Sequence, residues 1–320
     1  MNFWKKWFRD IDGSKRGDVR AEVKFGVLTF GYDSFANFRE ELSSQGYYET
    51  NLGDNAQSIA VRHVYRQLGI HDDQMVDINR DALPQYDGEP AILLMNGVFY
   101  SSCFPLPAAI TPVFIGFHAS EQVIKEQQEL LRKHQPIGCR DEATTARMKK
   151  HGIDAFTTGC ATLTLPRREE EPKTPKLLIV YGRNAGRLPP VVFRSIPERL
   201  LADADLIYHR FHESRFPLDA EMQREAERHE EALFARYRRE ATLVLTSLHH
   251  VATPCMAFGI PTIICRVRND ARFSLIEKWA PIYTPDKFEQ IDWYPPAVDV
   301  SAVRADFLQA ARQKIATARR

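Results

Sequence analysis

The segment LVLTSLHHVATPCMAFGIPTIIC, residues 243–265, decides the fold because it encodes a complete strand–helix–strand unit. Residues 243–246 and 262–265 are short apolar runs of strand length, and a helix fits between them through Phe258. The stretch that ends in Gly259-Ile-Pro261 is typical of a helix that returns to a strand. Strands that alternate with helices indicate a parallel α/β sheet.

The same alternation extends over both halves of the chain. Further strands are predicted at residues 23–32, 91–98, 113–117, 177–181 and 205–208. Helices are predicted at residues 56–68, 121–133 and 220–239, in a segment opened by residues 137–141 that runs to residue 150, and over the last twenty residues.

The charged, proline-flanked stretch PRREEEPKTP, residues 166–175, has no apolar anchor and interrupts this pattern as a linker. We therefore predict two Rossmann-like parallel-sheet lobes, at residues 21–166 and 176–320, joined by a linker at 167–175. Residues 1–20 form a separate N-terminal segment.

Composition excludes several classes of protein. With 43 basic against 42 acidic side chains, the chain lacks the basic excess of a nucleic-acid binder. Its five cysteines are scattered and form no CxxC pair, so we expect neither a zinc site nor a disulfide framework. No signal peptide and no apolar run of membrane-spanning length is visible, which predicts a cytoplasmic protein.

The first ten residues interleave aromatic and cationic side chains, in the stretch FWKKWFR at residues 3–9. One interpretation is that these aromatics dock on the protein itself. The other is a peripheral contact of residues 1–10 with lipid headgroups at the inner face of the membrane.

Ligands of open α/β sheets bind beyond the carboxyl ends of the strands, so polar groups at those ends are the candidate site residues. His249 and His250 follow a buried strand and open a helix, where a near-neutral imidazole can move protons. Arg140, followed by Asp141, also opens a helix and could bind an anion. Local packing and helix capping remain the alternatives for each of these residues.

Six motifs in order give the chain a resemblance to a known family. They are Asn51-x-Gly53-Asp54-Asn55, Met95 to Phe99, Gly138-Cys139-Arg140-Asp141-x-x-Thr144, Gly159 to Leu165, Thr246-Ser247-x-x-His250 continuing to Pro261, and Asp270-x-Arg272-Phe273. Over about residues 25–285, the chain resembles the polysaccharide pyruvyl transferase family.

The resemblance implies a fold like the GT-B glycosyltransferases, with a cleft between an N-terminal acceptor lobe and a C-terminal donor lobe. It also implies phosphoenolpyruvate as co-substrate, with no cofactor and no metal. The acceptor would be a saccharide diol, which becomes a cyclic pyruvate ketal in exopolysaccharide or capsule biosynthesis. The aromatic and basic N-terminus makes a lipid-linked acceptor the natural guess.

By position, the resemblance makes His250 the motif histidine near the donor and Arg140 a ligand of the donor anion. Since ketal formation needs a proton donor and a base, we assign as a hypothesis His250 as general acid or phosphate ligand and Asp54 as a candidate base, with a helix cap as the alternative for Asp54. The donor-binding residues are Arg140, His118, His249, Ser247, Arg183 and Arg272. The acceptor-binding residues are Asn55 and Asn96.

One position departs from the family pattern. Many relatives read Ser-Arg-Leu-His where this chain reads Ser247-Leu248-His249-His250, so the expected arginine is Leu248. Another cation must then meet part of the donor charge. The candidates are Arg183, Arg266, Arg268 and Arg272.

Two other functions stay open from the sequence. The first is a GT-B glycosyltransferase that uses a nucleotide sugar, with the turn at residues 182–186 as its diphosphate loop. The second is a non-catalytic sugar-binding relative, which the leucine at position 248 favours.

Overall fold

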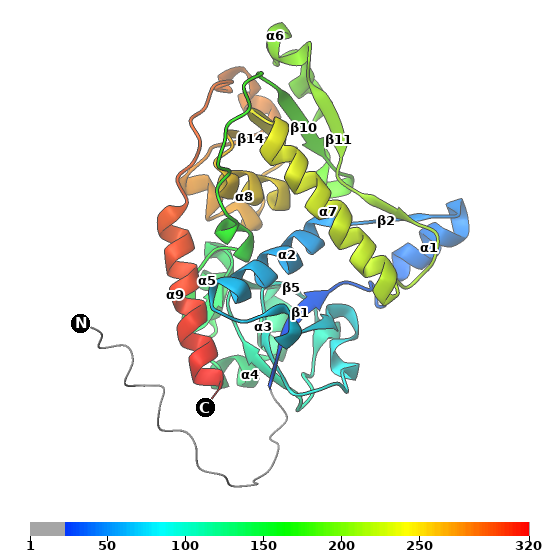
Figure 1. Ribbon diagram of the computed structural model, residues 1–320, viewed down its shortest axis with the longest axis vertical. Helices are drawn as coiled ribbons and strands as arrows, with labels where there is room; N and C mark the ends of the chain where they lie inside the picture. The colour runs from blue at the N-terminus through cyan, green and yellow to red at the C-terminus, as the bar shows by residue number, and fades with distance from the viewer. Residues whose placement is uncertain (1–22, 320) are drawn as a thin grey trace, which may run out of the picture.

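Three parallel sheets, two in the first half of the chain and one in the second, organise the computed structural model, which describes residues 23–319 (Figure 1). The first lobe has the strand orders β3-β1-β4-β6 and β5-β7-β8-β9. Its strands are β1 (Lys24–Thr29), β3 (Met75–Asn79), β4 (Ala91–Leu94), β5 (Gly97–Phe99), β6 (Ile110–Val113), β7 (Phe117–Ala119), β8 (Ile137–Cys139) and β9 (Ala155–Thr157).

The second lobe has one five-stranded sheet, in the order β11-β10-β13-β14-β15. Its strands are β10 (Leu177–Tyr181), β11 (Asp205–Tyr208), β13 (Leu243–Thr246), β14 (Thr262–Cys265) and β15 (Ile282–Tyr283). All ladders within these three sheets are parallel. The prediction of two Rossmann-like α/β lobes is confirmed.

Nine α-helices are found within the part of the chain that the structure describes. They are α1 (Ala36–Gln45), α2 (Leu52–Gln67), α3 (Glu121–Glu126), α4 (Gln128–Lys133), α5 (Glu142–Lys150), α6 (Glu198–Leu201), α7 (Ala220–Glu240), α8 (His249–Phe258) and α9 (Ser301–Ala318). Residues 243–265 form the expected unit of β13, α8 and β14.

Two predicted strands of the first lobe are each broken at the same level of the sheet. The run at 91–98 divides into β4 and β5, and β7 follows β6 only after a gap that contains Gly116. Gly97 and Gly116 have φ of 130° and 69°, which only glycine adopts readily, and Gly97 N–H donates to the Gly116 carbonyl. Asn96 sits at this break.

Two helix predictions were also wrong in detail. Residues 137–139 do not open a helix but form β8, and α5 begins only after Asp141 caps it. The predicted helix at 121–133 is divided between α3 and α4, because Gln127 leaves helical geometry at φ −106° and ψ 22°.

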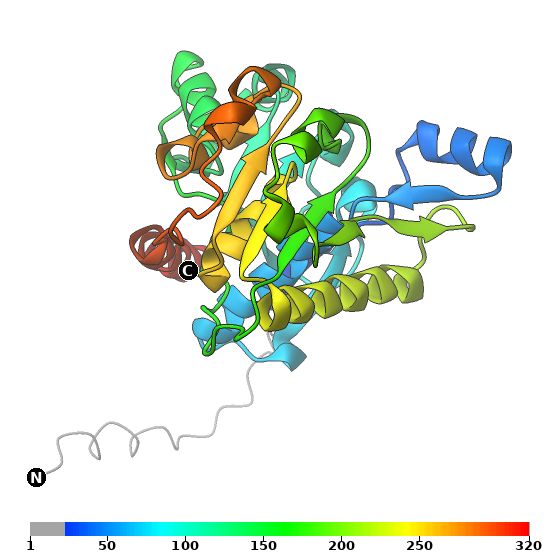
Figure 2. The ribbon, with the colours of Figure 1, turned by 90° about the horizontal axis from the view of Figure 1, so that it is seen from above.

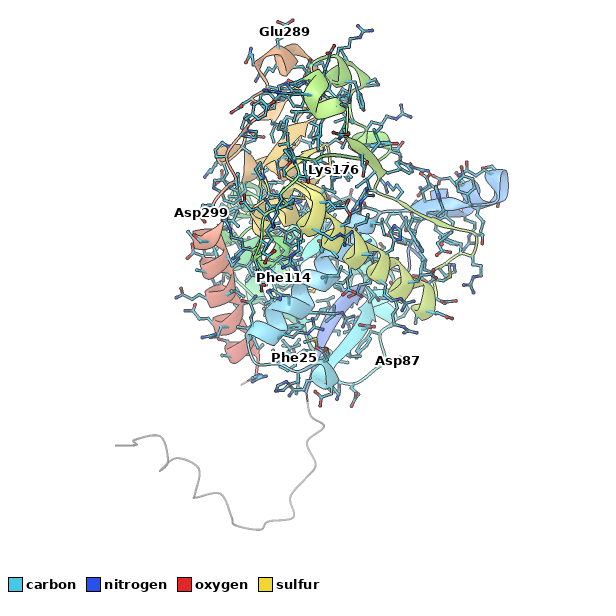
Figure 3. All side chains as sticks on the ribbon, turned by 45° about the horizontal axis from the view of Figure 1, so that its top comes forward. Phe25, Asp87, Phe114, Lys176, Glu289 and Asp299 are labelled. Atoms are coloured by element: carbon cyan, nitrogen blue, oxygen red, sulfur yellow. The ribbon has the colours of Figure 1, made fainter. Side chains whose placement is uncertain are left out.

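A shared apolar core joins the two lobes. Helix α2 of the first lobe packs against α7, α8 and the 3₁₀ helix η4 (Ala161–Thr164). Phe234 of α7 and Phe258 of α8 meet edge to face at 5.4 Å in this core, which also buries Tyr65 of α2. Figure 1 shows α7 lying across α2, and Figure 3 marks Phe25 in the first lobe and Lys176 in the second.

Two further segments cross between the lobes. Strand β2 (Tyr48–Thr50) pairs antiparallel with β12 (Phe211–Glu213), and Figure 2 shows this pair, with α1 beside it, projecting from the side of the molecule. Helix α9, predicted as part of the second lobe, runs along the first lobe and packs on β6 and η4 (Figure 1).

The predicted linker forms neither helix nor strand. It is anchored all the same, because Arg168 is buried and its guanidinium donates to the Ala241 carbonyl at 2.6 Å.

Candidate active site

The His249-His250 pair stands at the start of α8, where β13 ends. Thr246 Oγ1 donates to the Val180 carbonyl at 2.8 Å and accepts the N–H of Leu248 at 3.1 Å, which fixes the turn. The Ser247 hydroxyl donates to the Gly186 carbonyl, so it is already used in tying β13 to the neighbouring glycine turn. These hydrogen bonds fix the backbone turn from which both imidazoles project.

The first turn of α2 meets His250 from the other lobe. A Cβ at Gly53 would lie 2.8 Å from the Cβ of His250, so glycine permits this close approach. Asp54 follows in the same turn and is held by Tyr32, whose hydroxyl donates to Oδ2 at 3.1 Å. Asn51 is the N-cap residue of α2, so Asp54 does not cap the helix.

The first lobe contributes a buried arrangement of His118, Asp141 and Arg140. Asp141 Oδ2 lies 2.6 Å from His118 Nδ1 and 3.7 Å from Arg140 Nε, and Oδ1 accepts the N–H of Thr144 at 2.8 Å. Burial raises the pKa of Asp141, but His118, Arg140 and the Thr144 N–H together lower that pKa to about 2. Asp141 is thus a carboxylate that positions both a histidine and an arginine.

Arg140 is a buried cation with unused hydrogen-bond donors. Its side chain is 2% exposed, and Nε and Nη2 have no hydrogen-bond partner within residues 23–319. Burial lowers the pKa of its guanidinium, and the charge of Asp141 opposes that effect. A buried donor without an acceptor costs about 1–3 kcal/mol, and more for a charged group.

Both histidines of α8 are held neutral. Burial lowers the pKa of His250 well below 6.5, and the charges of Arg140 and Arg272 lower it further. Burial, His250 and Arg140 act in the same direction on the pKa of His249. The Nδ1 atoms of both rings have no hydrogen-bond partner in the described part of the chain.

Three adjoining cavities form one cleft along these residues. The innermost measures about 160 Å³ and is lined by residues of both lobes, among them Gly53, Arg210, His249 and His250. It shares Asn184, Arg266 and Arg272 with a cavity of about 560 Å³. That cavity shares His118 and Arg147 with a third, of about 510 Å³. His250 and His118 therefore face one continuous cleft from opposite lobes.

Comparison with known proteins identifies the family. A family model described as polysaccharide pyruvyl transferase matches residues 51–269. The chain belongs to the polysaccharide pyruvyl transferase family. It is therefore an enzyme of the pyruvyl transferase kind, and the family implies a saccharide acceptor.

Other comparisons add little to this assignment. No curated protein matches the chain. Among solved structures, the chain is similar to a functionally uncharacterised protein from Klebsiella pneumoniae subsp. pneumoniae NTUH-K2044, with 12% identity and a TM-score of 0.41. The match covers 79% of this chain and 88% of that one.

The predicted site residues of this pyruvyl transferase fall into three groups. Those that line the cleft are His118, Arg183, His249, His250 and Arg272. Those that lie just behind its wall or beside it are Asp54, Arg140 and Ser247. Those that line none of the three cavities and are buried in the first lobe are Asn55 and Asn96.

Asn96 is buried and hydrogen-bonded within the first lobe. It is 1% exposed, and its Oδ1 accepts the N–H of Ala161 at 3.0 Å. A Cβ at Gly116 would lie 2.0 Å from the same oxygen, so the amide is packed tightly into the break between β4 and β5. Asn96 thus holds η4 against the strands, and its acceptor-binding role stays a prediction.

Three of the four cations expected to replace the missing arginine already have carboxylate partners. Arg183 pairs with Glu41 and with Glu49 at 3.1 Å. Arg266 and Arg272 share Asp270, at 2.6 and 2.9 Å. The fourth, Arg268, is exposed and lines the cavity of about 560 Å³.

Sequence reasoning missed three residues of the cleft. His209 and Arg210 directly follow β11 and line the innermost cavity, so the rule about strand ends would have found them. His209 Nε2 lies 2.8 Å from Glu230 Oε2, and burial raises the pKa of that glutamate. Arg147 lies within α5, where no pattern distinguishes it from a surface arginine.

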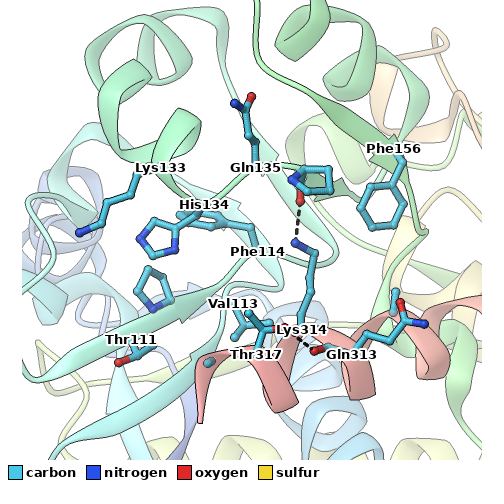
Figure 4. Close-up of a pocket in the computed structure, with 14 residues that line it drawn as sticks. Thr111, Val113, Phe114, Lys133, His134, Gln135, Phe156, Gln313, Lys314 and Thr317 are labelled. Atoms are coloured by element: carbon cyan, nitrogen blue, oxygen red, sulfur yellow. Dashed lines mark hydrogen bonds between the residues drawn. The ribbon is translucent and has the colours of Figure 1, made fainter. Parts of the chain in front are cut away.

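A further cavity of about 540 Å³ lies between α9 and β6, away from all predicted site residues. Figure 4 shows Lys314 of α9 reaching across it, where its amino group donates to the Pro136 carbonyl at 2.6 Å. Phe114, His134 and Phe156 also line it. It holds none of the buried, unpartnered polar groups that mark the cleft.

The described residues also bear on metal binding and on contact with a membrane. No group of three or more potential ligand residues within 23–319 is arranged to hold a metal ion. No helix of that same range is both long and apolar enough to cross a bilayer. The predicted membrane contact at residues 1–10 lies outside the described residues.

Proposed function

We propose that this enzyme moves pyruvate from phosphoenolpyruvate to a saccharide diol and leaves a cyclic ketal, in exopolysaccharide or capsule biosynthesis. The observation that carries the proposal is Arg140, a buried guanidinium with two unused donor nitrogens close to His118. A phosphate or carboxylate is the partner that a planar guanidinium binds best.

The size of the innermost cavity favours a small donor. At about 160 Å³ it has room for roughly five water molecules, since each takes about 30 Å³ in the liquid. A three-carbon phosphorylated acid is of that order. A nucleotide sugar is far larger and would have to extend through the adjoining cavity of about 560 Å³, so it is the weaker alternative.

The proposed reaction needs one proton at carbon and two hydroxyl groups. One sugar hydroxyl adds to C2 of phosphoenolpyruvate while C3 takes a proton and becomes the methyl group. The second hydroxyl then adds to C2, and the C2–O bond to phosphate breaks. One of the two hydroxyl protons restores the acid that protonated C3, and the other proton leaves with inorganic phosphate.

His250 is the proposed acid and Asp54 the proposed base. His250 is neutral in the free protein because burial and Arg140 lower its pKa. A bound donor with several negative charges would counter the arginine charges and raise that pKa, so the imidazole gains its proton together with the donor. Asp54, which Tyr32 holds in the same turn as Gly53, would accept the hydroxyl proton.

Phosphate release tests the proposal. The protein is incubated with phosphoenolpyruvate and saccharide acceptors, and inorganic phosphate is followed without any nucleotide. We expect acceptor-dependent release that Arg140→Met reduces by roughly 10²–10³-fold, the scale for loss of one donor to a developing anion. Saccharide binding with no release for any acceptor would instead support a sugar-binding protein, and turnover only with a nucleotide sugar would support a glycosyltransferase.

We extend the proposal to where the acceptor resides. The aromatic and basic residues 1–10 support a lipid-linked acceptor at the inner face of the membrane. The full chain and a variant that lacks residues 1–10 are mixed with liposomes and sedimented. We expect the full chain alone to sediment, and equal partitioning of the two would refute the membrane contact.

A further inference from the structure

Arg210 and Leu248 approach the same glycine turn of the second lobe. Measured to a Cβ built at Gly182, Leu248 Cδ2 lies at 3.2 Å, and Arg210 Nε and Nη2 lie at 3.5 and 3.7 Å. A Cβ at Gly186 would be 2.6 Å from the same leucine methyl. The side chain at position 248 and the guanidinium of residue 210 therefore both lie beside Gly182, and both residues line the innermost cavity.

Arg210 differs from the other arginines of that cavity in its partners. Arg183, Arg266 and Arg272 all contact carboxylates. Over residues 23–319, the Arg210 side chain has neither an ion pair nor a hydrogen bond, and its Nε is closed off from solvent. It is a cation with its donors unused, beside His249 and His250.

The backbone from which this guanidinium extends is held in place. Arg210 follows β11, and its N–H donates to the Tyr208 carbonyl at 3.0 Å. The next residue, Phe211, begins the β12 strand that pairs with β2 of the first lobe. The backbone of residue 210 is thus fixed between the sheet of the second lobe and the strand pair that joins the lobes.

We propose that Arg210 binds the anionic group of the donor and supplies the positive charge that a leucine at position 248 cannot. The inference rests on the proposed function, since the anion is phosphoenolpyruvate. Leu248 is uncharged and shorter than an arginine, so the guanidinium that extends from the end of β11 also reaches the space beside Gly182. Arg210 then contributes to donor affinity from the end of β11, whereas the histidine motif follows β13.

Binding of phosphoenolpyruvate by isothermal titration calorimetry tests this, with wild type, Arg210→Ala, Arg210→Lys and Arg187→Ala. Arg187 is an exposed arginine just after the same turn and lines none of the cavities, so it is the matched control. We expect Arg210→Ala to raise Kd at least tenfold, Arg210→Lys to give a smaller increase, and Arg187→Ala to bind as wild type. Melting temperatures of all variants establish that they are folded.

The double variant Arg210→Ala/Leu248→Arg tests the shared location. We expect it to recover at least part of the lost affinity, because the new arginine starts beside the same glycines. Competition by inorganic phosphate separates the two anionic ends of the donor. Weaker competition in Arg210→Ala places Arg210 at the phosphate, and unchanged competition places it at the carboxylate.

Arg210→Ala that binds phosphoenolpyruvate as tightly as wild type would overturn the inference and leave the proposed function standing. A double variant no better than Arg210→Ala would overturn the shared location. Wild-type protein that binds no phosphoenolpyruvate would refute the proposed function itself.

Discussion

Replacing Asp141 with asparagine removes the one carboxylate that Arg140 and His118 share, and leaves the shape of the site nearly unchanged. Asparagine can still cap α5 by accepting the Thr144 N–H, so the helix cap is preserved. The pKa of Asp141 is about 2, against an ordinary value of 3.8. That difference corresponds to about 2.5 kcal/mol of stabilisation of the ionised form, present at neutral pH and lost as the pH falls from about 5 to below 2.

We expect Asp141→Asn to lower stability by about 2.5 kcal/mol or more, because it leaves Arg140 buried without a counter-charge, a loss of about 3–5 kcal/mol in other buried pairs. At roughly 2–4 °C per kcal/mol for chains of this order of size, the melting temperature should drop by about 5–10 °C. Differential scanning calorimetry at pH 7.5 measures it.

The double variant Arg140→Met/Asp141→Asn is the matched control. Since it removes both charges together, most of the lost stability should return. Acceptor-dependent phosphate release should still be reduced by roughly 10²–10³-fold, as in Arg140→Met. Asp141→Asn with an unchanged melting temperature, or a double variant less stable than the single one, would refute the argument that Asp141 neutralises Arg140.

Three further predictions concern the cleft and its surroundings. Gly53→Ala brings a Cβ within 2.8 Å of His250 Cβ, so kcat/KM for phosphate release should fall roughly tenfold to a hundredfold with the fold intact; unchanged kinetics would disprove the close approach. The pKa values of His249 and His250 are lowered well below 6.5 in the folded protein, so only the unfolded chain takes up protons at these residues as the pH drops below about 6.5. The melting temperature should therefore decrease as the pH decreases, and it should decrease less steeply in His249→Gln. Glu49→Gln removes one of the two carboxylates that contact Arg183 and should lower the free energy of unfolding, measured in urea, by about 1–3 kcal/mol. An unchanged urea midpoint would contradict a stabilising Arg183–Glu49 pair.

The fold could be predicted because its signals are local. The apolar runs at 243–246 and 262–265, with a helix between them, specify their own unit. The breaks at Gly97 and Gly116 could not be predicted in the same way, because they depend on two strands that meet at one level of the sheet. The return of α9 to the first lobe depends on contacts made far away in sequence, with β6 and η4.

The cleft residues were predictable only where a strand end marks them. His249 and His250 follow β13, and the structure places both in the innermost cavity. The sequence could not reveal that Arg183 is neutralised, because Glu41 and Glu49 come from the other lobe. It likewise could not show that Asn96 faces Ala161, since residue 161 is distant along the chain.

The apolar core around α2, α7 and α8 has a consequence for how the protein can be handled. A chain cut within residues 167–175 would give two pieces that each expose the face that the other covers, Tyr65 on one side and Phe234 and Phe258 on the other. Neither piece should be soluble when produced alone, yet the two should assemble when produced in the same cell. An inserted sequence in that segment, between Glu169 and Pro175, should be tolerated so long as Arg168 keeps its bond to Ala241.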